Sequence, residues 1–319
     1  MKKKKKRIWI PILVILALLI GSGLILINKY GARFNIYLFP PSTEAYVKNA
    51  LVLMDNGIYA SGSEWEQEKD NAIKAAKDCN KYEETYVILN KALEVAGGKH
   101  SCIVSNEASN TMPSEELPTT DFNDGILYVK LPAYTFGSGL GEKYTNIVLS
   151  GTKQCKSELE GVIIDLRDNT GGDMGPMIAA VSPFLPDGVL MQFHVGDYYS
   201  AVTLSNGTVR GGGSTITVED IDILNVPIGI LQNEWTASSG EATLLCFVEL
   251  ENVKTFGCGS AGYCSCNDVY TLYDGDLLQL TVGTDVTSSG AEYCEDPILP
   301  DVETENPEDD ARAWIKGIE

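Results

Sequence analysis

The residues with the clearest chemical potential stand in the segment Thr236–Glu241, where small and polar residues separate two apolar runs. Ser238 and Glu241 have the S-x-x-E spacing of a capping box, in which a hydroxyl and a carboxylate satisfy the first free amides of a helix. A strand that turns sharply into a helix can expose the serine hydroxyl where unpaired N–H groups favour developing negative charge. A helix cap alone would explain this spacing, so the pattern permits nucleophilic catalysis without requiring it.

A second polar segment, Asp165–Gly172, follows directly on an apolar run with strand composition. Its last two residues, Gly171 and Gly172, can expose backbone amides where side chains would obstruct them. If the amide of Gly171 or Gly172 and that of Ser239 faced the Ser238 hydroxyl, they would form an oxyanion hole. An ordinary glycine turn is the simpler interpretation, and no G-x-G-x-x-G pattern supports dinucleotide binding.

A serine nucleophile normally needs a general base, and the chain contains two histidines. His194 lies in an alternating, strand-like run, so we expect it to be a satisfied sheet residue. His100 follows a predicted helix and the pair Gly97-Gly98, on a loop from which a side chain can project into a cleft. His100 is therefore the preferred base.

Composition and charge restrict the class of protein. The chain has 319 residues, of which 44% are hydrophobic and 21% charged, as in globular proteins. The formal net charge is −20, and residues 2–7 are all basic, so the rest of the chain carries −26. A surface of this sign repels phosphate backbones, which makes nucleic acid an unfavourable partner.

The N-terminus has the pattern of a membrane anchor. Residues 1–7 form a basic cytoplasmic segment, and residues 8–28 contain about twenty uncharged, apolar residues, enough for a transmembrane helix. Because the basic cluster precedes the apolar run, the remaining chain should lie outside the cell membrane. A cleaved signal peptide is the alternative, although the apolar run is longer than usual for one.

Eight cysteines are compatible with an extracellular location, where disulfide bonds form, although their pairing cannot be deduced from the sequence. A metal site is not indicated. Cys264 and Cys266 lack the C-x-x-C spacing and have no histidine nearby in the sequence. We therefore expect disulfides and neither a metal nor a cofactor.

The order of the predicted elements indicates an α/β fold. Three helices, Ser42–Asn56, Glu64–Cys79 and Tyr82–Val95, predict a small N-terminal helical lobe. Strands and helices then alternate, which is typical of a mixed β-sheet with βαβ crossovers. The predicted organisation is a juxtamembrane connector at 29–41, the helical lobe at 42–100, the main domain at 101–305 and an acidic tail at 306–319.

Several segments resemble the C-terminal-processing (tail-specific) serine peptidases of family S41. Within this family the similarity is to the branch of the tricorn core protease and the interphotoreceptor retinoid-binding protein. Gly98–Ser101 is similar to the D-G-H-S of that branch, Val162–Gly172 to its I-D-L-R-x-N-x-G-G, and Thr236–Glu241 to its T-A-S-S-G-E. Phe256–Gly262 and Ile298–Asp301 are similar to its F-G-x-x-T-A-G and G-I-x-P-D.

The resemblance implies a ClpP/crotonase-like core and catalysis by a serine and a histidine, here Ser238 and His100. Tyr263 occupies the position of the lysine in the Ser-Lys branch, so a Ser-Lys dyad is not expected. The resemblance also implies a late glutamate that orients the histidine. Glu295 matches this position best, and Glu292 is the alternative.

These observations predict a membrane-anchored extracellular serine endopeptidase that acts on peptides or unfolded proteins without a cofactor. No segment has the size of a PDZ module, so tail specificity is not expected. Because relatives of the retinoid-binding type use the same scaffold without proteolysis, a catalytically silent module that binds peptides or apolar ligands is the alternative. A structural surface protein would explain the cysteines but not the ordered motifs. The sequence leaves the oligomeric state open.

Overall fold

A computed structural model of the chain describes residues 9–31, 36–105, 116–219 and 222–317. The chain divides into two compact units. Unit 1 comprises residues 1–112 and 268–281, and unit 2 comprises residues 113–267 and 282–319. The predicted domain at 101–305 is therefore not one continuous unit, because the chain returns to unit 1 late in the sequence.

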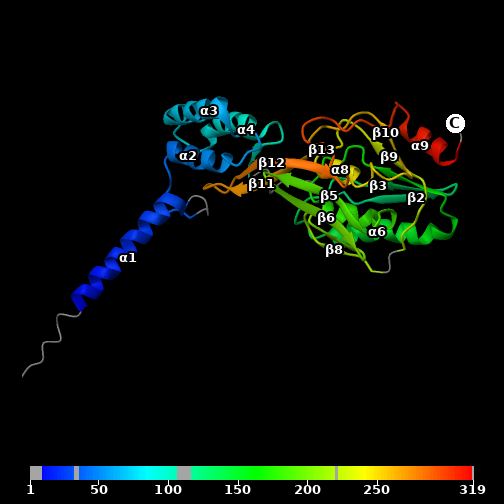
Figure 1. Ribbon diagram of the computed structural model, residues 1–319, viewed down its shortest axis with the longest axis horizontal. Helices are drawn as coiled ribbons and strands as arrows, with labels where there is room; N and C mark the ends of the chain where they lie inside the picture. The colour runs from blue at the N-terminus through cyan, green and yellow to red at the C-terminus, as the bar shows by residue number, and fades with distance from the viewer. Residues whose placement is uncertain (1–8, 32–35, 106–115, 220–221, 318–319) are drawn as a thin grey trace, which may run out of the picture. The chain divides into compact units, whose positions relative to one another are not determined.

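Unit 1 is mainly helical (Figure 1). Its helices are α1 (Trp9–Tyr30), α2 (Thr43–Met54), α3 (Gly62–Ala75), η2 (Ala76–Asp78), η3 (Glu83–Thr85) and α4 (Tyr86–Gly97). As predicted, α2 is capped by Ser42, whose Oγ accepts a hydrogen bond from the amide of Ala45 at 3.2 Å. After α4, β1 (Cys102–Val104) pairs antiparallel with the first residues of β12 (Leu277–Thr287).

Two predictions about the environment of the chain lack support in the structure. In the described part of the chain, no helix is long and apolar enough to cross a membrane, so the predicted span at 8–28 is not supported. All eight cysteines are free thiols, and the predicted disulfides are absent. The thiols instead contact acceptors close by: Cys246 Sγ lies 3.3 Å from the carbonyl oxygen of Ala242, and Cys155 Sγ lies 3.5 Å from that of Thr152.

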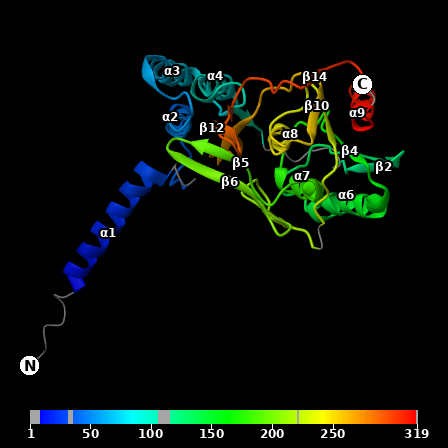
Figure 2. The same cartoon turned by 45° about the vertical axis from the view of Figure 1, so that its right-hand side comes forward.

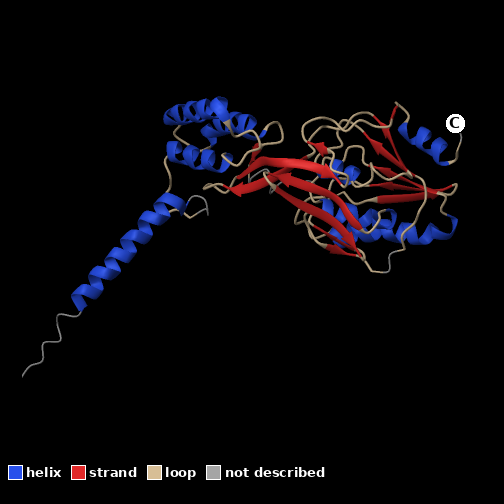
Figure 3. Ribbon diagram, viewed as in Figure 1, coloured by secondary structure: helices blue, strands red, loops and turns tan. Residues whose placement is uncertain are grey.

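The centre of unit 2 is a six-stranded sheet with the strand order β14-β10-β9-β4-β3-β2. Figure 3 draws the strands in red. All neighbours in this sheet are parallel except β3 and β2. The strands are β2 (Thr119–Asn123), β3 (Ile126–Lys130), β4 (Gly161–Asp165), β9 (Ile228–Gln232), β10 (Val253–Gly257) and β14 (Val302–Glu303). The sheet confirms the predicted α/β class, since α6 (Gly141–Cys155) connects β3 to β4 and α8 (Ser239–Leu245) connects β9 to β10.

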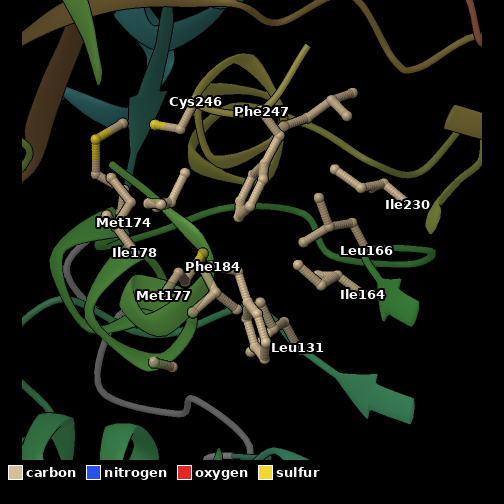
Figure 4. Close-up of a cluster of buried hydrophobic side chains, with 14 of the residues drawn as sticks. Leu131, Ile164, Leu166, Met174, Met177, Ile178, Phe184, Ile230, Cys246 and Phe247 are labelled. Atoms are coloured by element: carbon tan, nitrogen blue, oxygen red, sulfur yellow. The ribbon is translucent and has the colours of Figure 1, made fainter. Parts of the chain in front are cut away.

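Helices cover both faces of this sheet (Figure 2). Successive side chains of a strand point to opposite faces, so Val162 and Ile164 join the larger core with α6, α7 (Met174–Val181) and α8. Figure 4 shows this core, where Phe247 and Ile230 lie near Leu166. Ile163 faces the other way, toward α9 (Pro307–Ile315).

The helix α9 corrects the predicted acidic tail at 306–319. Its first turn carries Glu308, Asp309 and Asp310, which gives the segment its acidic character. Its later turns pack on the sheet, and Ala311 is fully buried. Gly229 makes this approach possible, because a Cβ there would lie 3.0 Å from the Cβ of Ala311.

A second, mostly antiparallel sheet completes unit 2. Its strands in this unit are β5 (Gly188–Val195), β6 (Tyr198–Ser205), β7 (Thr208–Arg210), β8 (Ile216–Thr217), β13 (Glu292–Tyr293) and the part of β12 from Val282 onward. β11 (Ser265–Thr271), which pairs with β12, lies mostly in unit 1. The last residues of β12 pair with β5, and β13 pairs with β12. The 3-10 turns η4 (Lys156–Glu158) and η5 (Ser182–Phe184) follow α6 and α7.

Candidate active site

Ser238 lies in unit 2, between the end of β9 and the first residue of α8. Its backbone has φ +52° and ψ −121°. Positive φ is disfavoured for a residue with a Cβ and is retained where the surroundings enforce it, often at functional sites. A serine held at a sharp strand-to-helix turn is also the arrangement of a nucleophile elbow. Its hydroxyl is thus placed at the start of a helix, as the sequence predicts.

Hydrogen bonds fix the turn that precedes Ser238. The Thr236 hydroxyl donates to the carbonyl oxygen of Leu166 at 2.9 Å. The Ala237 amide donates to the carbonyl oxygen of Asn169 at 2.9 Å. The turn is therefore bonded to the loop that follows β4, and these bonds offset the strain at Ser238.

Glu241 holds the same turn from the helix side. Its carboxylate is fully buried and accepts from the amide of Ser238 at 2.9 Å, as predicted for the glutamate of a capping box. It also accepts from the Ser260 hydroxyl at 2.5 Å and from the amides of Gly262 and Tyr263 at 2.8 and 2.7 Å. Burial raises the pKa of Glu241, while these four donors favour the ionised form.

The glycine turn lies directly against Ser238. Both glycines have positive φ, +100° at Gly171 and +111° at Gly172. A Cβ on Gly171 would lie 2.8 Å from the Cβ of Ser238 and 2.9 Å from the amide nitrogen of Ser239. The Ser239 hydroxyl donates to the carbonyl oxygen of Gly172 at 2.6 Å. The structure thus brings together the four residues predicted to form the nucleophile and its oxyanion hole.

The two glycine amides are not equivalent. The Gly171 amide donates to Asn169 Oδ1 at 3.0 Å, so it is already occupied. By contrast, the amides of Gly172 and Ser239 donate to no residue in the described part of the chain. The Gly171 amide is therefore occupied, and the amides of Gly172 and Ser239 are occupied by no described residue, while the oxyanion hole itself stays a prediction.

Asn169 is a residue that sequence reasoning missed. It is fully buried, and its Nδ2 donates to the carbonyl oxygen of Leu131 at 2.9 Å while its Oδ1 accepts from Gly171. Its backbone carbonyl accepts from Ala237. The side chain of Asn169 thus connects the glycine turn to the loop after β3, and its backbone carbonyl connects both to the nucleophile turn. In the sequence, Asn169 could have been identified as a polar amide residue that stands between a predicted buried strand and two glycines.

His100 lies in unit 1, on the turn after α4. Its carbonyl oxygen accepts from Gln279 Nε2 at 2.9 Å, which fixes the backbone of the turn. Burial, and secondarily the charge of Lys99, lower the pKa of His100 to about 4. The imidazole is therefore neutral at neutral pH, the form that can accept a proton. Its pairing with Ser238 stays a prediction.

His194 and Glu292 form a separate pair in unit 2. His194 Nδ1 lies 3.0 Å from Glu292 Oε1, and the imidazole stacks on Tyr199 with ring centroids 4.2 Å apart. The prediction that His194 is a satisfied sheet residue is therefore confirmed. Glu292, the alternative third member of a triad, is engaged with His194. Glu295 is half-buried beyond β13, and its role stays a prediction.

Comparison with known proteins assigns the family. The sequence model of peptidase family S41 matches residues 125–304, more than half of the chain. This chain belongs to peptidase family S41. It is therefore a serine-type peptidase, and the resemblance noted from the motifs is confirmed.

One relative matches nearly the whole S41 peptidase described above. The nisin-resistance protein of Lactococcus lactis subsp. lactis is 38% identical over 316 residues, which cover 98% of each chain. Among solved structures, a lipoprotein from Streptococcus agalactiae has a TM-score of 0.75 and 32% identity, over 88% of this chain and 99% of that chain. The photosystem II D1 C-terminal processing protease has a TM-score of 0.57 and 15% identity, over 84% and 94% of the two chains, and shows the fold alone.

Tyr263, which we predicted to occupy the position of the lysine in the Ser-Lys branch, lies beside the nucleophile turn. Its amide donates to the Glu241 carboxylate, so this position supports the nucleophile turn through the backbone.

No group of three or more histidine, cysteine, aspartate and glutamate side chains in the described ranges is arranged to hold a metal ion.

Proposed function

We propose that this S41 peptidase is an endopeptidase in which Ser238 attacks the peptide carbonyl and His100 is the general base. The observation that carries the proposal is the strained backbone of Ser238, with φ +52°, held against the glycine turn. Strain of this kind is retained when the surrounding structure enforces it, and here Glu241 and Asn169 provide the bonds that do so.

In this mechanism His100 takes the proton of the Ser238 hydroxyl as Oγ bonds to the carbonyl carbon. The amides of Gly172 and Ser239 stabilise the negative oxygen of the tetrahedral intermediate. His100 then gives the proton to the leaving amine, and water hydrolyses the acyl-enzyme in a second cycle. Glu295 would hold the imidazole in the required tautomer.

The lowered pKa of His100 keeps the proposed base neutral, and it also makes the imidazole a weaker base than one with a pKa near the operating pH. A histidine with a pKa of about 4 is neutral over the physiological range, so it is ready to accept a proton. The developing imidazolium would need a carboxylate nearby, which is the reason for including Glu295 in the proposal.

Two observations support a cationic peptide as substrate. The name of the Lactococcus relative connects that protein with resistance to nisin, a peptide that a peptidase could inactivate by cleavage. The net charge of −20 also favours the approach of a positively charged peptide. We therefore propose antimicrobial peptides of the nisin type as substrates of this chain.

An extracellular location follows as a proposal from the sequence alone. The basic residues 2–7 precede about twenty uncharged, apolar residues, an order that favours export of the remaining chain. Protease added to intact cells should then digest the full-length protein. A protein protected until the cells are lysed would overturn the location without affecting the proposed chemistry.

The test of the proposed function uses Ser238→Ala, with Ser150→Ala on the exposed surface of α6 as the matched serine control. Wild type and the control should cleave a peptide substrate and react covalently with a fluorophosphonate probe. Ser238→Ala should do neither, while its unfolding midpoint in urea stays close to that of wild type. Equal labelling of Ser238→Ala would overturn the assignment, and a wild type that neither cleaves nor labels would favour a silent binding module.

A further inference from the structure

Trp235 lies three residues before Ser238, in the turn between β9 and α8, and is 60% exposed. Three tryptophans have side chains that the structure describes. Of these, Trp65 is 1% exposed and Trp314 is half-buried against Phe256, so Trp235 alone is mostly exposed. A single exposed apolar side chain is common on protein surfaces, so exposure alone does not indicate a function for Trp235. Its position three residues before the proposed nucleophile does.

The backbone of Trp235 is held rigidly although its indole is exposed. The Trp235 amide donates to Asn233 Oδ1 at 3.1 Å, and the same oxygen accepts from the amide of Asp168 at 3.0 Å. The Asn233 amide donates to the Thr236 hydroxyl oxygen at 3.0 Å. An aromatic side chain on a fixed turn loses little conformational freedom when it binds a partner, which favours recognition.

Two exposed carboxylates, those of Asp168 and Glu234, belong to the segments that hold the backbone of Trp235. Glu234 Oε2 accepts a hydrogen bond from the neutral thiol of Cys258 at 3.3 Å. Asp168 is exposed and accepts from Asn233 Nδ2 at 2.9 Å, and the exposed Glu234 precedes Trp235 in the turn. Neither carboxylate forms an ion pair with any residue that the structure describes. The nearby Arg167 pairs with the buried Asp165 at 2.7 Å, so its charge is already balanced. The surface around Trp235 therefore keeps a negative potential.

We propose that Trp235, Asp168 and Glu234 form a subsite for a basic side chain of the peptide substrate. An indole face attracts an ammonium or guanidinium group, and the attraction is strongest where the cation is partly desolvated. The two carboxylates add a longer-range attraction for the same charge. The subsite rests on the proposed function, because its place beside Ser238 gives it a role in substrate selection.

The test compares internally quenched peptides that differ only in a lysine, glutamine or glutamate near the scissile bond. Wild type should prefer lysine. Trp235→Leu keeps an apolar side chain but removes the π face, so kcat/KM for the lysine peptide should fall about tenfold and that for the glutamine peptide by less than about twofold. Asp168→Asn and Glu234→Gln should each reduce the lysine preference about threefold, and less so at high salt. Tyr198→Ala, an 81% exposed aromatic residue of β6, is the matched control.

A second measurement separates this inference from the proposed function. In the Ser238→Ala background, fluorescence anisotropy of a labelled lysine peptide reports binding without cleavage, and Trp235→Leu should weaken that binding about tenfold. Equal losses for lysine and glutamine peptides, or no loss in either assay, would overturn the subsite while the peptidase assignment stands. If wild type cleaves none of the peptides, the proposed function and the subsite are both overturned.

Discussion

Glu241 and Asp285 are carboxyl groups buried in unit 2, with 0% and 2% exposure, but their surroundings are opposite. Each oxygen of Glu241 accepts two hydrogen bonds. Asp285 accepts only a weak one, from Cys264 Sγ at 3.5 Å to Oδ2, and its Oδ1 has no partner among the residues described. Both carboxyl groups are thus buried, but only Glu241 has hydrogen-bond donors that compensate for the loss of water.

The comparison teaches which buried acid the fold keeps charged. Burial, and to a lesser extent the charge of Glu241, raise the pKa of Asp285 to about 7. Burial also raises the pKa of Glu241, but there four donors oppose it. We infer that Glu241 is the anion that organises the nucleophile turn, and that Asp285 is largely neutral below pH 7.

Glu241→Gln should cause the largest effect. The substitution places an amide NH2 against two of the four donors, and each buried donor left without a partner costs about 1–3 kcal/mol. Displacement of Ser238 should lower kcat/KM by about two to three orders of magnitude. Peptide hydrolysis and urea unfolding measure the two effects. Asp285→Asn is the matched control, and an equal loss of activity in both variants would remove the distinction between the two sites.

Gly171→Ala tests whether the turn held by Glu241 tolerates displacement. The new Cβ would lie 2.8 Å from the Cβ of Ser238, at a φ of +100°. We expect kcat/KM to fall about tenfold to a hundredfold, because the nucleophile must shift. Gly290→Ala is the control, since Gly290 has φ +101° and no neighbour within 4 Å of such a Cβ. Similar losses in both variants would attribute the effect to backbone strain alone.

Asp285→Asn should change the pH dependence of stability. A carboxyl with a folded pKa of about 7 and an ordinary unfolded pKa stays protonated in the folded state while the unfolded state ionises. The contribution of this carboxyl group to the free energy of unfolding is complete below pH 4 and is lost as the pH rises to 7. Between pH 4 and 8, the free energy of unfolding measured in urea should fall by about 2–4 kcal/mol more for wild type than for Asp285→Asn. Parallel stability curves would show that Asp285 is compensated after all.

Local patterns predicted the elements that a short segment determines. The S-x-x-E spacing located the start of α8 and the Glu241 bond to Ser238, and the alternating run around His194 predicted a satisfied sheet residue. The mixed sheet with βαβ crossovers followed from alternating strands and helices. Each of these predictions rested on a pattern among residues that are close together in the sequence.

Features that depend on long-range contacts were not predicted. Which of two glycine amides is free depends on Asn169 folding back onto Gly171. The acidic first turn of α9 made the whole segment look solvent-exposed in the sequence. Its buried face is evident only from the structure, where Ala311 packs against Gly229 of β9. Cysteine pairing likewise requires distances that composition does not supply, and the even count wrongly suggested disulfides.

Lys99→Gln changes the surroundings of the half-buried His100 and should have the smallest effect. Burial lowers the pKa of His100 to about 4, with the Lys99 charge as the second cause. Activity should therefore be lost only as the pH falls well below 6.5, since protonated His100 cannot act as the base. Removing the Lys99 charge should move this acid limb of kcat/KM upward by about half a pH unit, and the shift should shrink at high salt. Lys81→Gln is the exposed-lysine control. An acid limb near pH 6.5 in wild type would show that the imidazole is solvated, and that burial does not set its pKa.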